Sequence, residues 1–129
     1  MAGTDAIPTR ELHAGQVFEL HKLKEFTPTE RVRKKLFKTG QLWAEIACYE
    51  PGQSTVMHKH PFEEEAIFVL EGTPNMNIDG EEVTLPPGSV VRFPPGVMHD
   101  LRNLGNDRCV IMFIKVPTRL ARLAEAEHG

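Results

Sequence analysis

Glycine and proline divide this chain into short segments, and that division limits the folds open to it. The 129 residues include 10 glycines and 10 prolines, together more than the usual share of about 12%. From residue 40 onwards most of them fall at short intervals, at Gly40, Pro51-Gly52, Gly72, Pro74, Gly80, Pro86-Pro87-Gly88, Pro94-Pro95-Gly96 and Gly105. Turns at such spacing favour short strands, and hence a sandwich or a barrel.

The segments between these turns have the composition of strands. Residues 42–49, 66–70, 90–93 and 109–116 are apolar or rich in β-branched side chains. Asp79 and Gly80 lie between apolar neighbours, which predicts a hairpin turn. The sequence therefore predicts an all-β, antiparallel fold.

Both ends of the chain contain signals for helix. Thr27-Pro28-Thr29-Glu30 matches a capping box, which favours a helix, but the β-branched and aromatic residues in 31–37 favour a strand, and we expect a strand there. Thr118, followed by apolar residues at helical spacing, predicts a short C-terminal helix over 118–127. The chain length suits one domain, 1–129, with a barrel core of about 31–116 and an N-terminal arm of 1–30.

Some predicted strands are apolar on both faces and need cover on both sides. In a chain of this size a second subunit can supply the second cover, so we expect a homodimer. Lys and Arg are concentrated in residues 22–38, and Asp and Glu in 61–82. These charges either cover two solvated strand faces or meet across the subunit interface.

Composition argues against several kinds of partner. A net charge of −3 does not suit a general nucleic-acid binder. No apolar run approaches the roughly 20 residues of a membrane span, and residues 1–10 show no secretory signal, so we expect a cytoplasmic protein. Cys48 and Cys109 lie in apolar segments, where we expect buried free thiols.

Four potential metal ligands lie in two similar segments. His58 and His60 are two residues apart, so on an extended segment both imidazoles point to the same side. A turn at Pro61 can bring the Glu65 carboxylate round from the next segment, and His99 follows a second strand and Pro-Gly turn. Imidazole and carboxylate together suit iron, manganese, nickel, copper or zinc as divalent ions.

These two segments resemble the two sequence motifs of the cupin family. The first motif, G-x5-H-x-H-x4-E-x6-G, is matched at every fixed position from Gly52 to Gly72. The second, G-x5-P-x-G-x2-H-x3-N, is matched at every fixed position from Gly88 to Asn103. The resemblance implies a single small antiparallel cupin β-barrel, jelly-roll-like, with the metal inside. We expect one divalent transition metal per chain, with iron favoured and manganese, nickel, zinc or copper as alternatives. The resemblance also implies four metal ligands: His58, His60, Glu65 and His99.

Glu63 and Glu64 compete with Glu65 for the ligand role, and the six-residue gap to Gly72 in the motif favours Glu65. Ile67 and Val69 share the alternation of Glu65, so we expect them to line the same cavity. Asn103 is expected to fix a turn or a strand end and not to bind metal.

Cupin relatives have several activities, so the fold and the ligands leave the reaction open. The favoured function is a dioxygenase acting on a small enolisable or phenolic substrate. The first alternative is a non-oxidative isomerase, lyase or decarboxylase, which needs an acid or base beside the metal. Candidates for that role are Tyr49, Glu63, Glu64, Asp100 and Arg102, although Asp100 and Arg102 alternate with His99 and are expected to face away. The second alternative is a small-molecule-binding cupin without turnover.

Overall fold

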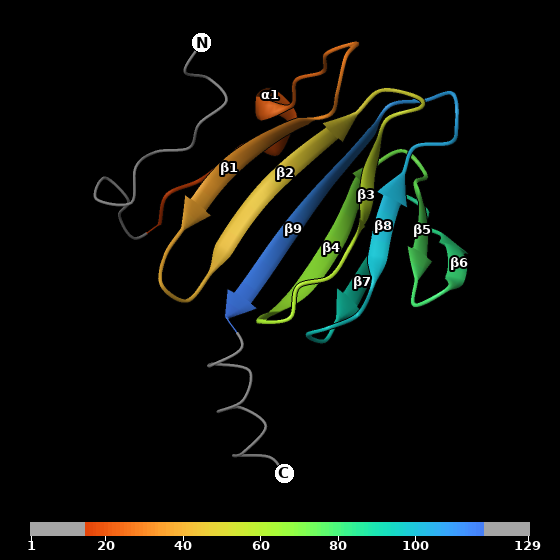
Figure 1. Cartoon of the computed structure of the whole chain (residues 1–129). Coiled ribbons are helices and arrows are strands. Elements are labelled where there is room, and N and C mark those ends of the chain that lie inside the picture. The colour runs from red at the N-terminus through yellow and green to blue at the C-terminus, as the bar shows by residue number, and fades with distance from the viewer. Residues whose placement is uncertain (1–14, 118–129) are drawn as a thin grey trace.

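The computed structural model describes residues 15–117 (Figure 1). They form nine β-strands, arranged in two sheets, and one short helix. The larger sheet has the strand order β1-β2-β9-β4-β7, and the smaller has the order β3-β8-β5-β6. The elements are α1 (Leu20–Leu23), β1 (Val32–Lys38), β2 (Trp43–Tyr49), β3 (Ser54–His58), β4 (Glu63–Glu71), β5 (Asn75–Ile78), β6 (Glu81–Thr84), β7 (Val90–Phe93), β8 (His99–Arg102) and β9 (Cys109–Pro117). Within the described part, no helix is long and apolar enough to cross a membrane.

Every strand pair in both sheets is antiparallel. In Figure 1, β3 and β8 of the smaller sheet lie in front of β4 and β7, and β5 and β6 lie to their right. One apolar cluster joins the facing sides of the two sheets. This arrangement is the jelly-roll fold of the cupins and confirms the predicted fold class.

The main core lies between the sheets because alternate residues of the facing strands point inward. Ile67 and Val69 of β4 pack there with Phe93 of β7, and Met76 and Leu101 join them from the smaller sheet. Glu65 shares the inward direction of Ile67 and Val69, as the two-residue alternation of a strand requires. The core strands thus carry a buried carboxylate among apolar side chains.

A second apolar cluster covers the outer face of β1, β2 and β9. Val32, Ile46 and Val110 are buried there, with Phe18 and Phe26 of the N-terminal segment packed against them. The chain's own residues 18–26 therefore supply part of the cover that we expected from a second subunit. The homodimer stays a prediction.

The structure contains the strand and the hairpin turn that local sequence patterns predict. The strand expected over 31–37 is present as β1, and no helix follows Thr27, whose hydroxyl hydrogen-bonds the backbone of Glu30. Asp79 and Gly80 form the hairpin turn between β5 and β6, both with positive φ. Helix α1 was not predicted. The predicted C-terminal helix over 118–127 and residues 1–14 of the N-terminal arm lie outside the described residues.

The two cysteines are free and buried, as predicted. Cys48 belongs to the outer cluster and Cys109 to the inner core, so their side chains lie on opposite faces of the larger sheet. This arrangement keeps the thiols apart although β2 and β9 are paired.

Candidate functional site

Three histidine side chains meet where the two sheets join. His58 ends β3, His60 lies in the turn after it, and His99 begins β8, which pairs with β3 through His58. Each ring offers one nitrogen to a group whose members all lie within 4.8 Å of one another. The motif histidines predicted from the sequence are therefore positioned together to bind a metal.

Backbone carbonyls orient two of these rings. His58 Nδ1 lies 2.6 Å from the Val56 carbonyl oxygen, and His99 Nδ1 lies 3.0 Å from the Val97 carbonyl oxygen. Because a carbonyl oxygen can only accept, Nδ1 must donate in both pairs, which leaves the Nε2 lone pair free in the neutral ring. This second interaction of a histidine is typical of metal ligands.

Glu65 projects from β4 towards the same point. Its side chain is only 5% exposed, and Oε1 lies 3.4 Å from His60 Nε2 and 3.3 Å from His99 Nε2. Yet Oε1 is a buried oxygen without a well-formed hydrogen bond to any described residue. A buried, under-coordinated carboxylate oxygen beside imidazole nitrogens fits the donor set of a divalent transition metal.

The neighbouring glutamates occupy other positions. Glu63 Oε1 lies 3.6 Å from His60 Nδ1, which is not the ring nitrogen that faces Glu65. Glu64 accepts a hydrogen bond from the exposed Arg92 at 2.6 Å. The geometry therefore supports Glu65, rather than Glu63 or Glu64, as the carboxylate of the site.

The histidines differ in their affinity for protons. Burial and the positive charge of Lys115 lower the pKa of His60 to about 4, so this ring is neutral at pH 7. Burial alone would lower the pKa of His99, but the nearby Glu65 carboxylate and the Val97 carbonyl raise that pKa overall. A metal ion therefore competes with a proton at His99 more than at His60.

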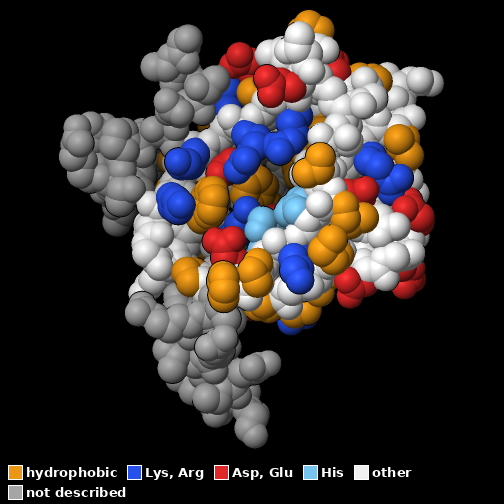
Figure 2. Space-filling view, viewed as in Figure 1, with side chains coloured by type: hydrophobic (Ala, Val, Ile, Leu, Met, Phe, Trp, Pro, Cys, Tyr) orange, Lys and Arg blue, Asp and Glu red, His pale blue; other side chains and the backbone are white. Residues whose placement is uncertain are grey.

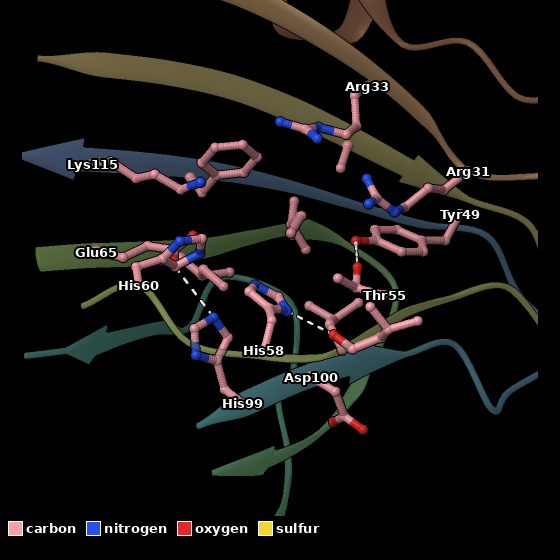
Figure 3. A pocket seen from close by; sticks show the side chains of 16 residues that line it. Arg31, Arg33, Tyr49, Thr55, His58, His60, Glu65, His99, Asp100 and Lys115 are labelled. Carbon is pink, nitrogen blue, oxygen red and sulfur yellow. Dashed lines mark hydrogen bonds and ion pairs between the residues drawn. The ribbon is translucent and has the colours of Figure 1, made fainter. Parts of the chain in front are cut away.

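These ligand candidates lie in the wall of a cavity of about 230 Å³ (Figure 3). In the space-filling view, histidine side chains lie at its opening, with Lys and Arg side chains above them and hydrophobic side chains beside them (Figure 2). The apolar part of the wall consists of Ala47, Val56, Ile67, Leu101, Ile111 and Phe113. Ile67 lines the cavity as predicted, whereas Val69 lies in the core behind it.

Three cations in the wall were missed by the sequence analysis: Arg31, Arg33 and Lys115. Lys115 follows Ile111 and Phe113 at two-residue spacing on β9, so its alternation could have placed it in the cavity. Arg31 and Arg33 have the same spacing in and beside β1. Without the register between β1, β2 and β9, however, nothing in the sequence relates them to the histidines.

Of the acid–base candidates, Tyr49 lies inside the cavity, where its hydroxyl is 2.8 Å from Thr55 Oγ1. The side chain of Asp100 points away from the histidines (Figure 3). Its Oδ1 accepts a hydrogen bond from the Asn77 backbone N–H at 2.8 Å, and its Oδ2 lies 3.2 Å from Arg102 Nε. Asp100 is among the residues that line the cavity, but its carboxylate points away from the histidines as expected, and Arg102 is not among the lining residues.

Asn103 fixes a turn, as predicted. Its side-chain amide donates to the carbonyl oxygens of Tyr49 and Asp107, at 3.3 Å and 2.8 Å, and its Oδ1 accepts from the Gly105 N–H at 3.3 Å. These bonds hold the loop that follows β8 and leave the side chain no role at the histidines.

Known proteins resemble this chain in sequence. A 68-residue segment is 31% identical to the protein named polyketide synthase CurC from Streptomyces cyaneus, and it covers 53% of this chain and 44% of that protein. The chain spans about half the length of the curated relatives that it matches.

Solved structures resemble it in fold. The protein TT1209 from Thermus thermophilus has a TM-score of 0.74 at 23% identity, over 78% of this chain and 96% of that chain. An RmlC-like cupin protein from Desulfovibrio desulfuricans has a TM-score of 0.71 at 20% identity, over 78% of this chain and 95% of that chain.

The family model described as "Cupin domain" matches residues 45–115. This match covers more than half of the chain and contains all three histidines and Glu65. Together with the jelly-roll sheets and the two complete motifs, it shows that the chain belongs to the cupin family.

Proposed function

We propose that the protein is a metal-dependent dioxygenase that acts on a small enolisable or phenolic organic compound. One observation supports this function above all. Three imidazoles gather at one end of a largely apolar cavity, and a buried, under-coordinated oxygen of Glu65 lies 3.4 Å from His60 Nε2 and 3.3 Å from His99 Nε2. We assign four ligands to one divalent metal per chain, with iron favoured: His58, His60, Glu65 and His99.

Backbone carbonyls orient the histidine ligands of this site, and apolar side chains shape the space beside them. The carbonyls of Val56 and Val97 hold the rings of His58 and His99 so that Nε2 is available as a ligand. A divalent metal bound here supplies a Lewis acid for substrate oxygen and, in the case of iron, reactivity towards dioxygen. The walls formed by Ile67, Ile111 and Phe113 exclude water and favour a substrate with an apolar body.

Lys115 suits a substrate that forms a negatively charged enolate or phenolate. The side chain is 7% exposed and points towards the histidine end of the cavity (Figure 3). Its Nζ lies 4.5 Å from the Trp43 ring centroid and 4.8 Å from that of Phe113, and no carboxylate among residues 15–117 pairs with it. A fixed ammonium group beside the ligands attracts the oxygen of an enolate or phenolate.

The relative from Streptomyces cyaneus supports the same substrate class. Its name assigns it to polyketide synthesis, and polyketide chains carry carbonyl groups on alternate carbons, which enolise and cyclise to phenols. A cavity with candidate metal ligands, the ammonium group of Lys115 and apolar walls suits such compounds.

A non-oxidative isomerase, lyase or decarboxylase is the second candidate, and the Tyr49–Thr55 pair favours it. These two hydroxyls lie 2.8 Å apart in the cavity wall and can pass a proton to a ligand. Burial raises the pKa of Tyr49 above its usual value, although the Thr55 hydrogen bond and the charge of Arg31 oppose that rise. The phenol therefore stays protonated at neutral pH and acts as a proton donor.

Oxygen consumption tests the favoured function. Iron(II)-loaded protein is mixed with pentane-2,4-dione or with catechol in an oxygen electrode, and the loss of each compound is followed by chromatography. We expect one dioxygen consumed per substrate molecule lost, and no loss with zinc-loaded protein. Turnover under argon would contradict a dioxygenase and support the non-oxidative reaction. Binding of either compound without any turnover, under air or argon, would support the small-molecule-binding cupin.

A further inference from the structure

Arg31 is a cation in the cavity wall without a partner in the described chain. It directly precedes β1, and its side chain points into the cavity (Figure 3). Among residues 15–117 the guanidinium forms no hydrogen bond and no ion pair. A half-buried guanidinium without a counter-charge is unfavourable, because it loses hydration without gaining a carboxylate.

Arg33, two residues further on, shows the contrast. Its Nε and Nη2 donate to the two oxygens of Glu45 at 3.0 Å and 3.2 Å, and Glu45 is 3% exposed. Trp43 Nε1 also donates to Glu45, at 2.5 Å. Glu45 is therefore fully engaged by Arg33 and Trp43, and among residues 15–117 the cations of the cavity wall without a carboxylate partner are Arg31 and Lys115.

The position of Arg31 separates it from the metal-binding end. His60, Glu65 and Lys115 lie at one end of the cavity, whereas Arg31 lies at the other, beside Tyr49 (Figure 3). Its charge acts on the Tyr49 hydroxyl, as the effect on the pKa of that group shows. One end of the cavity thus offers a ligand the candidate metal ligands, and the other end offers it a guanidinium group and a phenol hydroxyl.

Arg31 also lies where the cavity meets an open groove on the surface. The groove is lined by residues 29–31, 33, 52–54 and 56, so Arg31, Arg33 and Val56 belong to both hollows. A ligand that extends from the histidines towards solvent therefore passes Arg31.

We propose that Arg31 binds a carboxylate of the substrate. The site then takes compounds with enolisable oxygens at one end and a carboxylate at the other. This inference rests on the proposed function, because the enolisable end is placed at the metal ligands. The planar guanidinium matches a carboxylate with two parallel hydrogen bonds. The Tyr49–Thr55 pair shares one hydroxyl hydrogen between its oxygens and keeps the other to donate to the same ligand.

Two matched probes test the inference. Heptane-2,4-dione and 4,6-dioxoheptanoate have the same diketone and the same chain length, and they differ only in a terminal methyl or carboxylate. Their dissociation constants are measured by calorimetry on zinc-loaded protein, because zinc has no redox chemistry and leaves the probes intact. We expect 4,6-dioxoheptanoate to bind the wild type about tenfold more tightly or better, as a charge-assisted hydrogen bond allows. High salt should reduce this gain.

Three variants locate the effect. Arg31→Gln should abolish the gain from the carboxylate, while heptane-2,4-dione, which lacks that group, binds variant and wild type alike and reports an intact site. Arg31→Lys should retain part of the gain, because it keeps the charge but loses the planar pair of donors. Arg92→Gln is the matched control. It removes the same charge from a side chain that is 68% exposed and outside the cavity, and the gain should persist.

The binding results distinguish a failure of the proposal about Arg31 from a failure of the proposed function. If 4,6-dioxoheptanoate gains nothing over heptane-2,4-dione in the wild type, or if the gain survives Arg31→Gln, the inference about Arg31 is wrong while diketone binding still supports the proposed function. If neither diketone binds the wild type, the proposed enolisable substrate is contradicted, and the role of Arg31 with it.

Discussion

Glu65 Oε1 lies 3.3 Å from His99 Nε2 although the two residues belong to different sheets. Glu65 is on β4 of the larger sheet, and His99 is on β8 of the smaller one. Both side chains are buried. The candidate site therefore forms only when the two sheets pack together, which couples any metal binding to folding.

The first prediction distinguishes Glu65 from its neighbour. We expect Glu65→Gln to weaken zinc or cobalt binding by more than the roughly 10–100-fold that the loss of an outer-shell partner costs, because it removes the negative donor from the buried end of the site. Glu63→Gln should leave the affinity nearly unchanged, since Glu63 lies 3.6 Å from the other ring nitrogen of His60. Titration of the metal-free proteins with cobalt, followed by visible absorption, measures both affinities.

His60→Ala belongs to the same series and should remove most metal binding. The ligand assignment is wrong if Glu63→Gln empties the site while Glu65→Gln does not. Thermal unfolding of each metal-free variant shows whether the fold has survived the substitution.

The second prediction concerns pH. Tyr49 is the chain's single tyrosine, and its burial raises its pKa above the ordinary value of 10.0. A raised folded pKa means that the stability from the buried phenol is fully present below about pH 10 and is lost as the pH rises through the folded pKa. Absorption at 295 nm should therefore show phenolate forming above pH 10 in the native protein and near pH 10 in guanidinium. Ionisation of native Tyr49 at or below pH 10 would show that the hydroxyl is not buried as described.

The third prediction concerns a motif glycine. Gly72 has φ +81°, and a Cβ there would lie 2.5 Å from the Arg108 carbonyl oxygen and 2.6 Å from Cys109 Sγ. We expect Gly72→Ala to lower the free energy of unfolding by about 2–4 kcal/mol, because backbone strain and overpacking add.

Gly80→Ala is the control for this substitution. Gly80 has φ +89° but open space around the Cβ position, so only the backbone strain of about 1 kcal/mol should appear. Urea unfolding measures both variants. Equal losses would mean that the close approach to β9 contributes nothing.

Local patterns in the sequence were enough to predict much of this fold. Turn residues and β-branched segments mark the strands, and two-residue alternation places Glu65 and Ile67 on one inward face. The two motifs then identify the histidines that the structure brings together. These features could be predicted because each depends on residues that are close in sequence.

Features that depend on distant packing could not be predicted in this way. Phe18 and Phe26 cover the outer face because the N-terminal segment packs against the apolar cluster of β1, β2 and β9. Arg31 and Lys115 are far apart in the sequence, and only the register of β1 on β2 and of β2 on β9 brings them to the same cavity. Which arginine stays unpaired depends on Glu45 binding Arg33.

The metal content of the purified protein decides whether the three histidines and Glu65 form a metal centre. The measurement is elemental analysis of tag-free protein that has been prepared without chelator and without added metal. We predict close to one transition-metal ion per chain, lost in parallel from His60→Ala and Glu65→Gln and retained in Glu63→Gln. A wild-type protein that is empty as purified and also fails to take up added iron, manganese, nickel or zinc would contradict the claim that these side chains form a metal centre.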